Sequence, residues 1–112
     1  MTRYLISFDD GSMTFPEEEA PAVGEAAHAV VRAAQEAGVW IVGGGVESQR
    51  ASIVATDGMV TDGPYPETKA VIGGFAMVDV PSREEALEWA AKFAAACRTP
   101  QEVREIMFDP LV

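Results

Sequence analysis

The sequence predicts an α+β domain of the ferredoxin-like kind, in which two helices cover one face of an antiparallel sheet. Strand-like and helix-like segments follow one another in the order β, α, β, β, β, α, β. Apolar residues alternate in the strand-like segments and recur at helical spacing in two alanine-rich ones. A compact domain satisfies this order by laying both helices on the same face of the sheet. A chain of 112 residues with 48% hydrophobic residues is expected to form a single domain, residues 1–112.

The first third of the chain predicts a strand, a loop and a helix. Residues 4–8 are aromatic or branched in four of five positions, and turn residues from Asp9 to Ser12 follow them. Residues 14–21 contain two prolines and three consecutive glutamates, which favours a solvated loop. Residues 22–37 have the helical spacing and precede Gly38, a residue type common just after a helix.

The middle of the chain predicts strands and a hairpin. Residues 39–42 form a second strand that runs into Gly43-Gly44-Gly45. Asp57-Gly58, a two-residue turn signal, lies between strand-like residues 51–56 and 59–61. Residues 71–80 form the next strand, and Gly73-Gly74 near its start indicate a bulge or a close approach of another group.

The last third predicts a second helix and a final strand. Ser82 and Glu85 have the spacing of a capping box, so the helix is expected to run from there to about residue 96. Its apolar face is expected to bury Ala86, Leu87, Ala90, Phe93 and Ala94 or their near neighbours. Residues 99–102 repeat the capping pattern with proline at the first helical position, so a helical turn competes there with a strand over 103–108. The strand is favoured.

The strand over residues 71–80 carries apolar side chains on both of its faces. Phe75 and Met77 point to one face, while Ala76, Val78 and Val80 point to the other. Two helices can cover only one face, and a whole apolar face in water exceeds what soluble monomers usually tolerate. We therefore expect a homodimer whose sheets pack face to face.

Composition argues against several classes of function. Eight basic against eighteen acidic residues give a formal charge of −10, which repels nucleic acid. No apolar stretch approaches the roughly 20 residues of a membrane helix and no signal-like segment opens the chain, so a cytoplasmic protein is expected. One cysteine and one histidine make neither an internal disulfide nor an ordinary zinc site. No nucleotide-binding or nucleophile-elbow motif occurs, and no cofactor is expected.

His28 is the first candidate for chemistry, because its imidazole is the only side chain whose ordinary pKa lies near neutrality. It lies in the first predicted helix beside the apolar stripe, where a structural histidine bonded to a carbonyl or carboxylate is the competing interpretation. A carboxylate next to His28 would favour the interpretation that the histidine takes part in chemistry. Asp62 is the preferred partner and Asp9 the alternative, while Cys97 is interpreted as a small core residue.

The segment around Asp62 is the second candidate. In the run 61–69, Gly63 permits a positive φ and two prolines hold the chain extended about Tyr65, which is costly ordering for a mere connection. A rigid turn in which Asp62 caps its own backbone is an equal alternative to a functional segment. Tyr65 and Thr68 can donate hydrogen bonds to a substrate, and Trp40 or Phe75 can line an apolar cleft. Arg3 and Arg50 are possible contacts for an anion, although ordinary surface or dimer salt bridges explain them more readily. Lys69 alone would be interpreted as forming a solvated pair with Glu67.

The run of residues 60–69, Gly73-Gly74-Phe75 and the helix around Leu87 to Ala90 resemble the YCII-related family and its DGPF branch. Tyr65 replaces the phenylalanine for which that branch is named. The resemblance spans nearly the whole chain and implies a dimeric α+β barrel. Part of the family has a histidine of the first helix paired with an aspartate, proposed as an acid/base dyad. His28 matches that histidine to within about one position, and Asp62 is the candidate partner, with Asp9 as the alternative. Some relatives are lyase- or isomerase-type enzymes, and the branch occurs near sigma-factor-like proteins.

Three hypotheses follow. The first is a cofactor-independent enzyme in which His28 moves a proton and Asp62 orients the imidazole; such a pair typically contributes about 10²–10⁴-fold in rate. Its substrate would be a small organic molecule that contacts Tyr65, Thr68, Lys69 or Arg50. The second is a non-catalytic ligand-binding or regulatory module in which His28 is structural. The third, a metal site formed by His28 with Asp9, Asp10 or Asp62, has no spacing signature in its favour.

Overall fold

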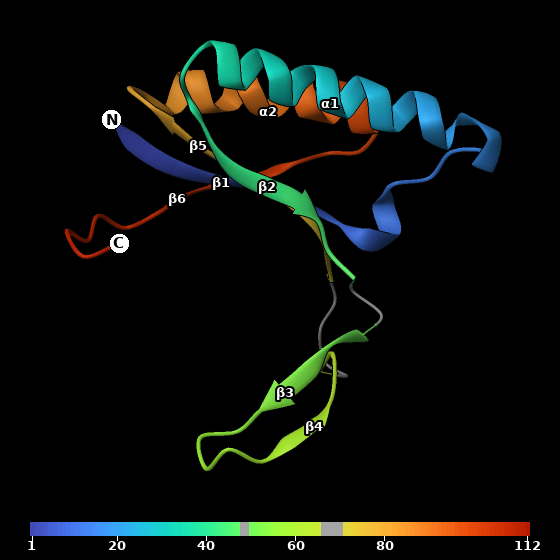
Figure 1. Cartoon of the computed structure of the whole chain (residues 1–112), viewed down its shortest axis with the longest axis vertical. Helices are drawn as coiled ribbons and strands as arrows, with labels where there is room; N and C mark the ends of the chain where they lie inside the picture. Colours follow the sequence, from blue (N-terminus) through green and yellow to red (C-terminus); the bar gives the residue numbers. More distant parts are fainter. Residues whose placement is uncertain (48–49, 66–70) are drawn as a thin grey trace.

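The computed structural model describes residues 1–47, 50–65 and 71–112, so Thr68 and Lys69 lie outside the described residues. Four strands form an antiparallel sheet in the order β2-β5-β1-β6. They are β1 (Thr2–Asp9), β2 (Trp40–Gly45), β5 (Ile72–Val80) and β6 (Glu102–Glu105). The helices α1 (Ala20–Glu36) and α2 (Arg83–Cys97) lie side by side on one face of this sheet (Figure 1). The expected α+β, ferredoxin-like class is confirmed.

The core lies between that sheet face and the two helices. Alternate residues of β1 and β5 face the helices and are buried, namely Tyr4, Ile6, Ala76, Val78 and Val80. Phe75 and Met77 alternate with them and are only half-buried, as the two-sided pattern predicts. The opposite face of the sheet has no helix on it in the described part of the chain.

The helix α1 begins earlier than the sequence pattern indicates. Segment 14–21 was expected to be a loop, but the short 3-10 turn η2 (Glu17–Glu19) leads directly into α1 at Ala20. Pro21 fits the first turn of a helix because that turn has no use for the missing N–H. A second 3-10 turn, η1 (Asp10–Ser12), follows β1.

The helix α2 confirms one expectation and corrects another. The Ser82 hydroxyl accepts a hydrogen bond from the Glu85 backbone N–H at 3.2 Å, as the capping box predicts. Leu87 was expected in the core and is 45% exposed, whereas Trp89 is buried. One face of α2 is buried, at positions 86, 89, 90, 93 and 97. Position 87 is rotated by about 100° about the helix axis from position 86, so Leu87 lies off this face. Near the C-terminal end, the chain forms the strand β6 and not a helical turn, so the favoured alternative is confirmed.

Glycines in β2 and β5 leave room for aromatic rings on the sheet. Phe8 pairs with Gly74 and Asp9 with Ile72, so Gly73 is an extra residue and the expected bulge is present. A Cβ at Gly74 would lie 2.6 Å from the Phe8 ring. A Cβ at Gly43 would lie 2.7 Å from the Trp40 ring and 2.6 Å from the Phe75 carbonyl oxygen. Each ring therefore occupies the space that a glycine leaves.

The predicted hairpin forms, but it does not join the main sheet. Its strands β3 (Ser52–Val54) and β4 (Val60–Asp62) make a separate two-stranded sheet. The turn has Gly58 at φ 88°, and the Asp57 side chain accepts a hydrogen bond from the Met59 N–H at 2.9 Å. The hairpin extends away from the body, on the opposite side of the sheet from the helices (Figure 1). We call residues 51–65 the arm.

Candidate functional site

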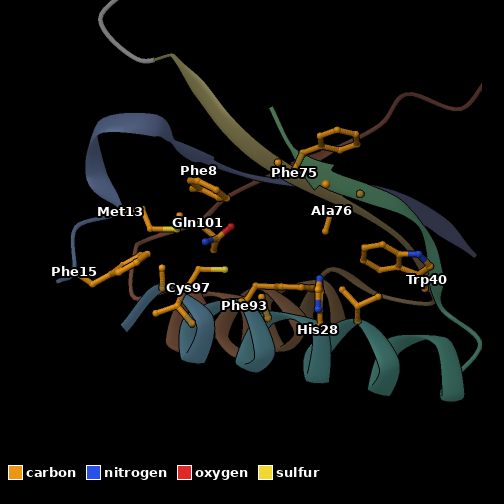
Figure 2. A pocket seen from close by; sticks show the side chains of 18 residues that line it. Phe8, Met13, Phe15, His28, Trp40, Phe75, Ala76, Phe93, Cys97 and Gln101 are labelled. Atoms are coloured by element: carbon orange, nitrogen blue, oxygen red, sulfur yellow. The ribbon is translucent and has the colours of Figure 1, made fainter. Parts of the chain in front are cut away.

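A pocket of about 480 Å³ lies between α1 and the helix-covered face of the sheet (Figure 2). This volume is in the range of small-molecule sites. The lining is mainly apolar. It comprises Phe8, Met13, Phe15, Ala20, Val23, Gly24, Ala27, His28, Val31, Trp40, Gly43, Gly44, Gly45, Phe75, Ala76, Phe93, Cys97 and Gln101.

The residues of α1 that line the pocket share one face of the helix. Ala27 and His28 each lie three or four positions from both Gly24 and Val31, so the four residues form a continuous strip opposite the sheet. Small residues at 24 and 27 leave the space that a larger side chain would fill. His28 extends from this strip toward Phe93 and the sheet in Figure 2.

The two ends of the pocket are aromatic. At one end, the Trp40 and Phe93 rings lie 6.3 Å apart at an interplanar angle of 38°. At the other end, Phe8 lies near Met13 and Phe15 in Figure 2. The Phe75 ring points away from His28 to the other side of the sheet, so Phe75 does not present its ring to the pocket. Of the two aromatic residues expected at a cleft, Trp40 is therefore the one whose ring lines it.

Three side chains bring polar atoms to the pocket wall, those of His28, Cys97 and Gln101. Gln101 donates a hydrogen bond to the Thr99 carbonyl oxygen at 3.2 Å. Burial raises the pKa of the Cys97 thiol, which keeps it protonated and poorly nucleophilic. No hydrogen bond joins His28 to another side chain in the described part of the molecule. No carboxylate is among the described lining residues.

Asp62 and His28 do not meet within one chain. Asp62 is exposed on β4, and the four-stranded sheet lies between the arm and α1 (Figure 1). Tyr65, on the same arm, is 60% exposed, and Arg50, directly before the arm in the chain, is exposed as well. None of these three residues lines the pocket. Of the expected catalytic and substrate-binding residues in the described ranges, only His28 lines it.

Asp9, the alternative partner of His28, has a local structural role. Its carboxylate accepts a hydrogen bond from the Val71 N–H at 3.0 Å, and its carbonyl accepts one from the Ser12 hydroxyl at 2.8 Å. The Ser12 hydroxyl also lies 2.5 Å from that of Thr99. These bonds join the end of β1 to the segments before β5 and β6. Residues 1–47, 50–65 and 71–112 contain no group of three potential metal-binding side chains.

Sequence reasoning missed several lining residues. Phe15 was assigned to a solvated loop, and neither Met13 nor Gln101 was expected at a site. The glycines of β2 and β5 were the available signal, because a glycine inside a strand often marks a close approach of another group. That signal indicates that something lies over the strand, but not which ring. Gln101 has no comparable signal.

A comparison with models of known protein families decides the classification, because the model of the YCII-related domain matches residues 2–108. The chain belongs to the YCII-related family. The match covers the sheet, both helices and the arm, as the resemblance of the sequence implied. No curated protein matches the chain. No helix in the described ranges of this YCII-related protein is long and apolar enough to cross a membrane.

Proposed function

We propose that this YCII-related protein binds a small, largely apolar organic molecule in the pocket between α1 and the sheet. The observation that carries the proposal is the 480 Å³ volume with an apolar lining and a single imidazole in its wall. Apolar pockets with a few placed polar groups are the usual form of small-molecule sites. The His28 imidazole can make one contact with a polar or anionic group of the ligand.

A fluorescent anionic probe, anilinonaphthalene sulfonate, tests this directly. Ala27 lines the pocket and Ala29, two residues along α1, is exposed and does not. Ala27→Phe is expected to weaken probe binding by about tenfold or more, a loss of about 1.4 kcal/mol, whereas Ala29→Phe leaves it unchanged. Probe binding should also shift the His28 ring-proton signals in NMR spectra, which are free of other histidines.

Equal probe binding by the Ala27→Phe and Ala29→Phe proteins would contradict the proposal. Circular dichroism of both proteins shows whether each is folded. His28→Gln distinguishes the role of the imidazole, because it removes the ionisable group and keeps a side chain that can hydrogen-bond. It is expected to weaken binding of the anionic probe, because glutamine cannot carry the positive charge that an imidazole can.

The second candidate is the acid/base enzyme, favoured by one observation: the His28 imidazole lines the pocket and has no partner among the described side chains. In this hypothesis a bound substrate exchanges a proton with His28, while a carboxylate orients the ring and stabilises its charged form. Because no described lining residue is a carboxylate, Asp62 would have to come from a second copy of the chain. Asp62→Asn would then displace the His28 ring-proton signals in NMR spectra, and unchanged signals would exclude the pair.

The proposed assembly is a homodimer in which the helix-free face of the sheet packs against the same face of a second copy. Phe75 and Met77 of β5 are half-buried in the single chain, and Val42 of β2 pairs beside Met77 and is 47% exposed. Arg3 and Asp79 are cross-strand neighbours at the rim of this face. An apolar centre with a charged rim is typical of protein interfaces. Light scattering after gel filtration measures the mass.

A further inference from the structure

We propose that the arm is exchanged between two copies of the chain, and that it packs on the β2 edge of the second copy, next to the pocket. The inference rests on the proposed function in one respect, because the site that the arm completes is the proposed small-molecule pocket. Four observations carry it: the surface of the chain, the exposure of the arm, the difference between the sheet edges and the position of β2 in the pocket wall.

The isolated chain exposes more surface than a compact protein of its size. Its accessible surface is 7668 Å². A compact monomer of this mass exposes about 6,000 Å², so the excess is roughly 1,700 Å². The radius of gyration is 15.5 Å, against about 13 Å for a compact domain of this length. A standard interface covers about 800 Å² of each partner, so the excess is ample for a stable dimer.

The arm contributes part of the exposed apolar surface, and the residues after β6 contribute another part. Val54, Met59 and Val60 are 66%, 66% and 63% exposed. An isolated two-stranded hairpin is marginally stable in water and ordinarily needs a third strand or a packing partner. Within its own chain, the arm extends away from both helices (Figure 1). Cover for its apolar side chains must therefore come from another molecule.

The two edges of the main sheet differ in a way that selects β2 as the receiving edge. The β6 edge carries the charged residues Glu102, Arg104 and Glu105, which protect an edge against pairing. The β2 edge has no charged residue from Trp40 to Gly45, and it exposes Ile41 and Val42. Its outer side is unpaired in the described sheet, because β2 pairs only with β5. It can accept an added strand.

A second copy of the same chain is the occupant that fits both surfaces. Each chain has one uncovered apolar arm and one unprotected apolar edge, so two chains related by a two-fold axis satisfy both at once. The formal charge of −10 on each copy makes mainly apolar, backbone-paired contacts the favourable kind between copies. Gly43, Gly44 and Gly45 of the β2 edge also line the pocket. An arm on this edge therefore adds residues of the second copy to the border of the pocket.

Cross-linking between differently tagged chains tests the exchange. Both chains carry Cys97→Ser, which removes the single natural cysteine. One chain also carries Met59→Cys on the arm and the other Ile41→Cys on β2, and the purified mixed assembly is treated with a short bis-maleimide. The expected product is a covalent heterodimer with both tags. The control replaces Ile41→Cys with Leu87→Cys, an exposed position on α2. Cross-linking no better than that of the control would overturn the inference.

A pair of aspartate variants gives a second measurement. Met59→Asp on the arm is expected to lower the dimer fraction in light scattering and to weaken binding of anilinonaphthalene sulfonate by about tenfold. Leu87→Asp, on exposed α2 surface, should change neither. A fully dimeric Met59→Asp protein with wild-type probe affinity would overturn the inference. Failure of the exchange is distinct from failure of the binding function, because the Ala27→Phe comparison tests the pocket without changing the arm or the β2 edge.

Discussion

Replacing Gly43 by alanine tests whether the Trp40 ring occupies the space that the glycine leaves. The new Cβ would lie 2.6 Å from the Phe75 carbonyl oxygen, 2.7 Å from the Trp40 ring and 3.0 Å from the Ala76 Cα. Two of these three neighbours are backbone atoms of the adjacent strand, so the sheet itself has to move. Overpacking of this kind costs about 1–3 kcal/mol. For a domain of this size, that corresponds to a fall in Tm of about 4–12 °C.

Gly44 supplies the matched control. It is the next residue of β2, its side-chain position faces the other side of the sheet, and a Cβ there meets nothing within 4 Å. Gly44→Ala is therefore expected to leave Tm unchanged or slightly raised. Urea unfolding monitored by circular dichroism gives the free energies, and tryptophan fluorescence reports any displacement of Trp40. Equal losses of stability in the two variants would refute the assignment of Trp40 to the Gly43 face.

Three further changes have defined outcomes. Gly24→Ala in α1 should raise the free energy of unfolding by about 0.5–1 kcal/mol in urea titrations, since alanine favours a helix and a Cβ there meets nothing within 4 Å. Ser82→Ala should lower it by about 1 kcal/mol through loss of the bond from the Glu85 N–H, while Ser52→Ala on the arm should not. Burial raises the pKa of the Cys97 thiol in the folded protein. The neutral thiol therefore makes its full contribution to the free energy of unfolding below about pH 8.5, and this contribution is lost at higher pH, where the thiol of the unfolded chain ionises. Between pH 7 and 9.5 the wild type should therefore lose more stability than Cys97→Ala, and equal losses would show that burial does not perturb the thiol.

The fold could be predicted from the sequence because its signals are local. The Ser82 to Glu85 spacing, the Asp57-Gly58 turn and the alternation from Phe75 to Val80 each depend on residues close together in the chain. Local hydrogen bonds and pleat geometry turn such spacing directly into structure. Leu87 and Trp89 show the limit, because both suit an amphipathic helix and only the packing of α2 on the sheet decides which is buried.

The candidate site could be predicted only in part, because it depends on contacts between distant segments. His28 was identified by its chemistry, and it does line the pocket. Its pairing with Asp62 required α1 and the arm to meet, and the sheet separates them within one chain. Met13 and Phe15 reach the pocket because the turn after β1 returns toward α1. No spacing rule in the sequence encodes that return.

The uneven protection of the sheet edges also limits how large an assembly can grow. A sheet with two unprotected edges can add copies at both ends without limit, which is how fibres form. Here the charged residues of β6 block one end. A reciprocal exchange between two chains then occupies both arms and both β2 edges of the pair, so neither an unpacked arm nor an unpaired β2 edge remains for a third chain. The same edge that makes the single chain prone to association thus makes the association finite.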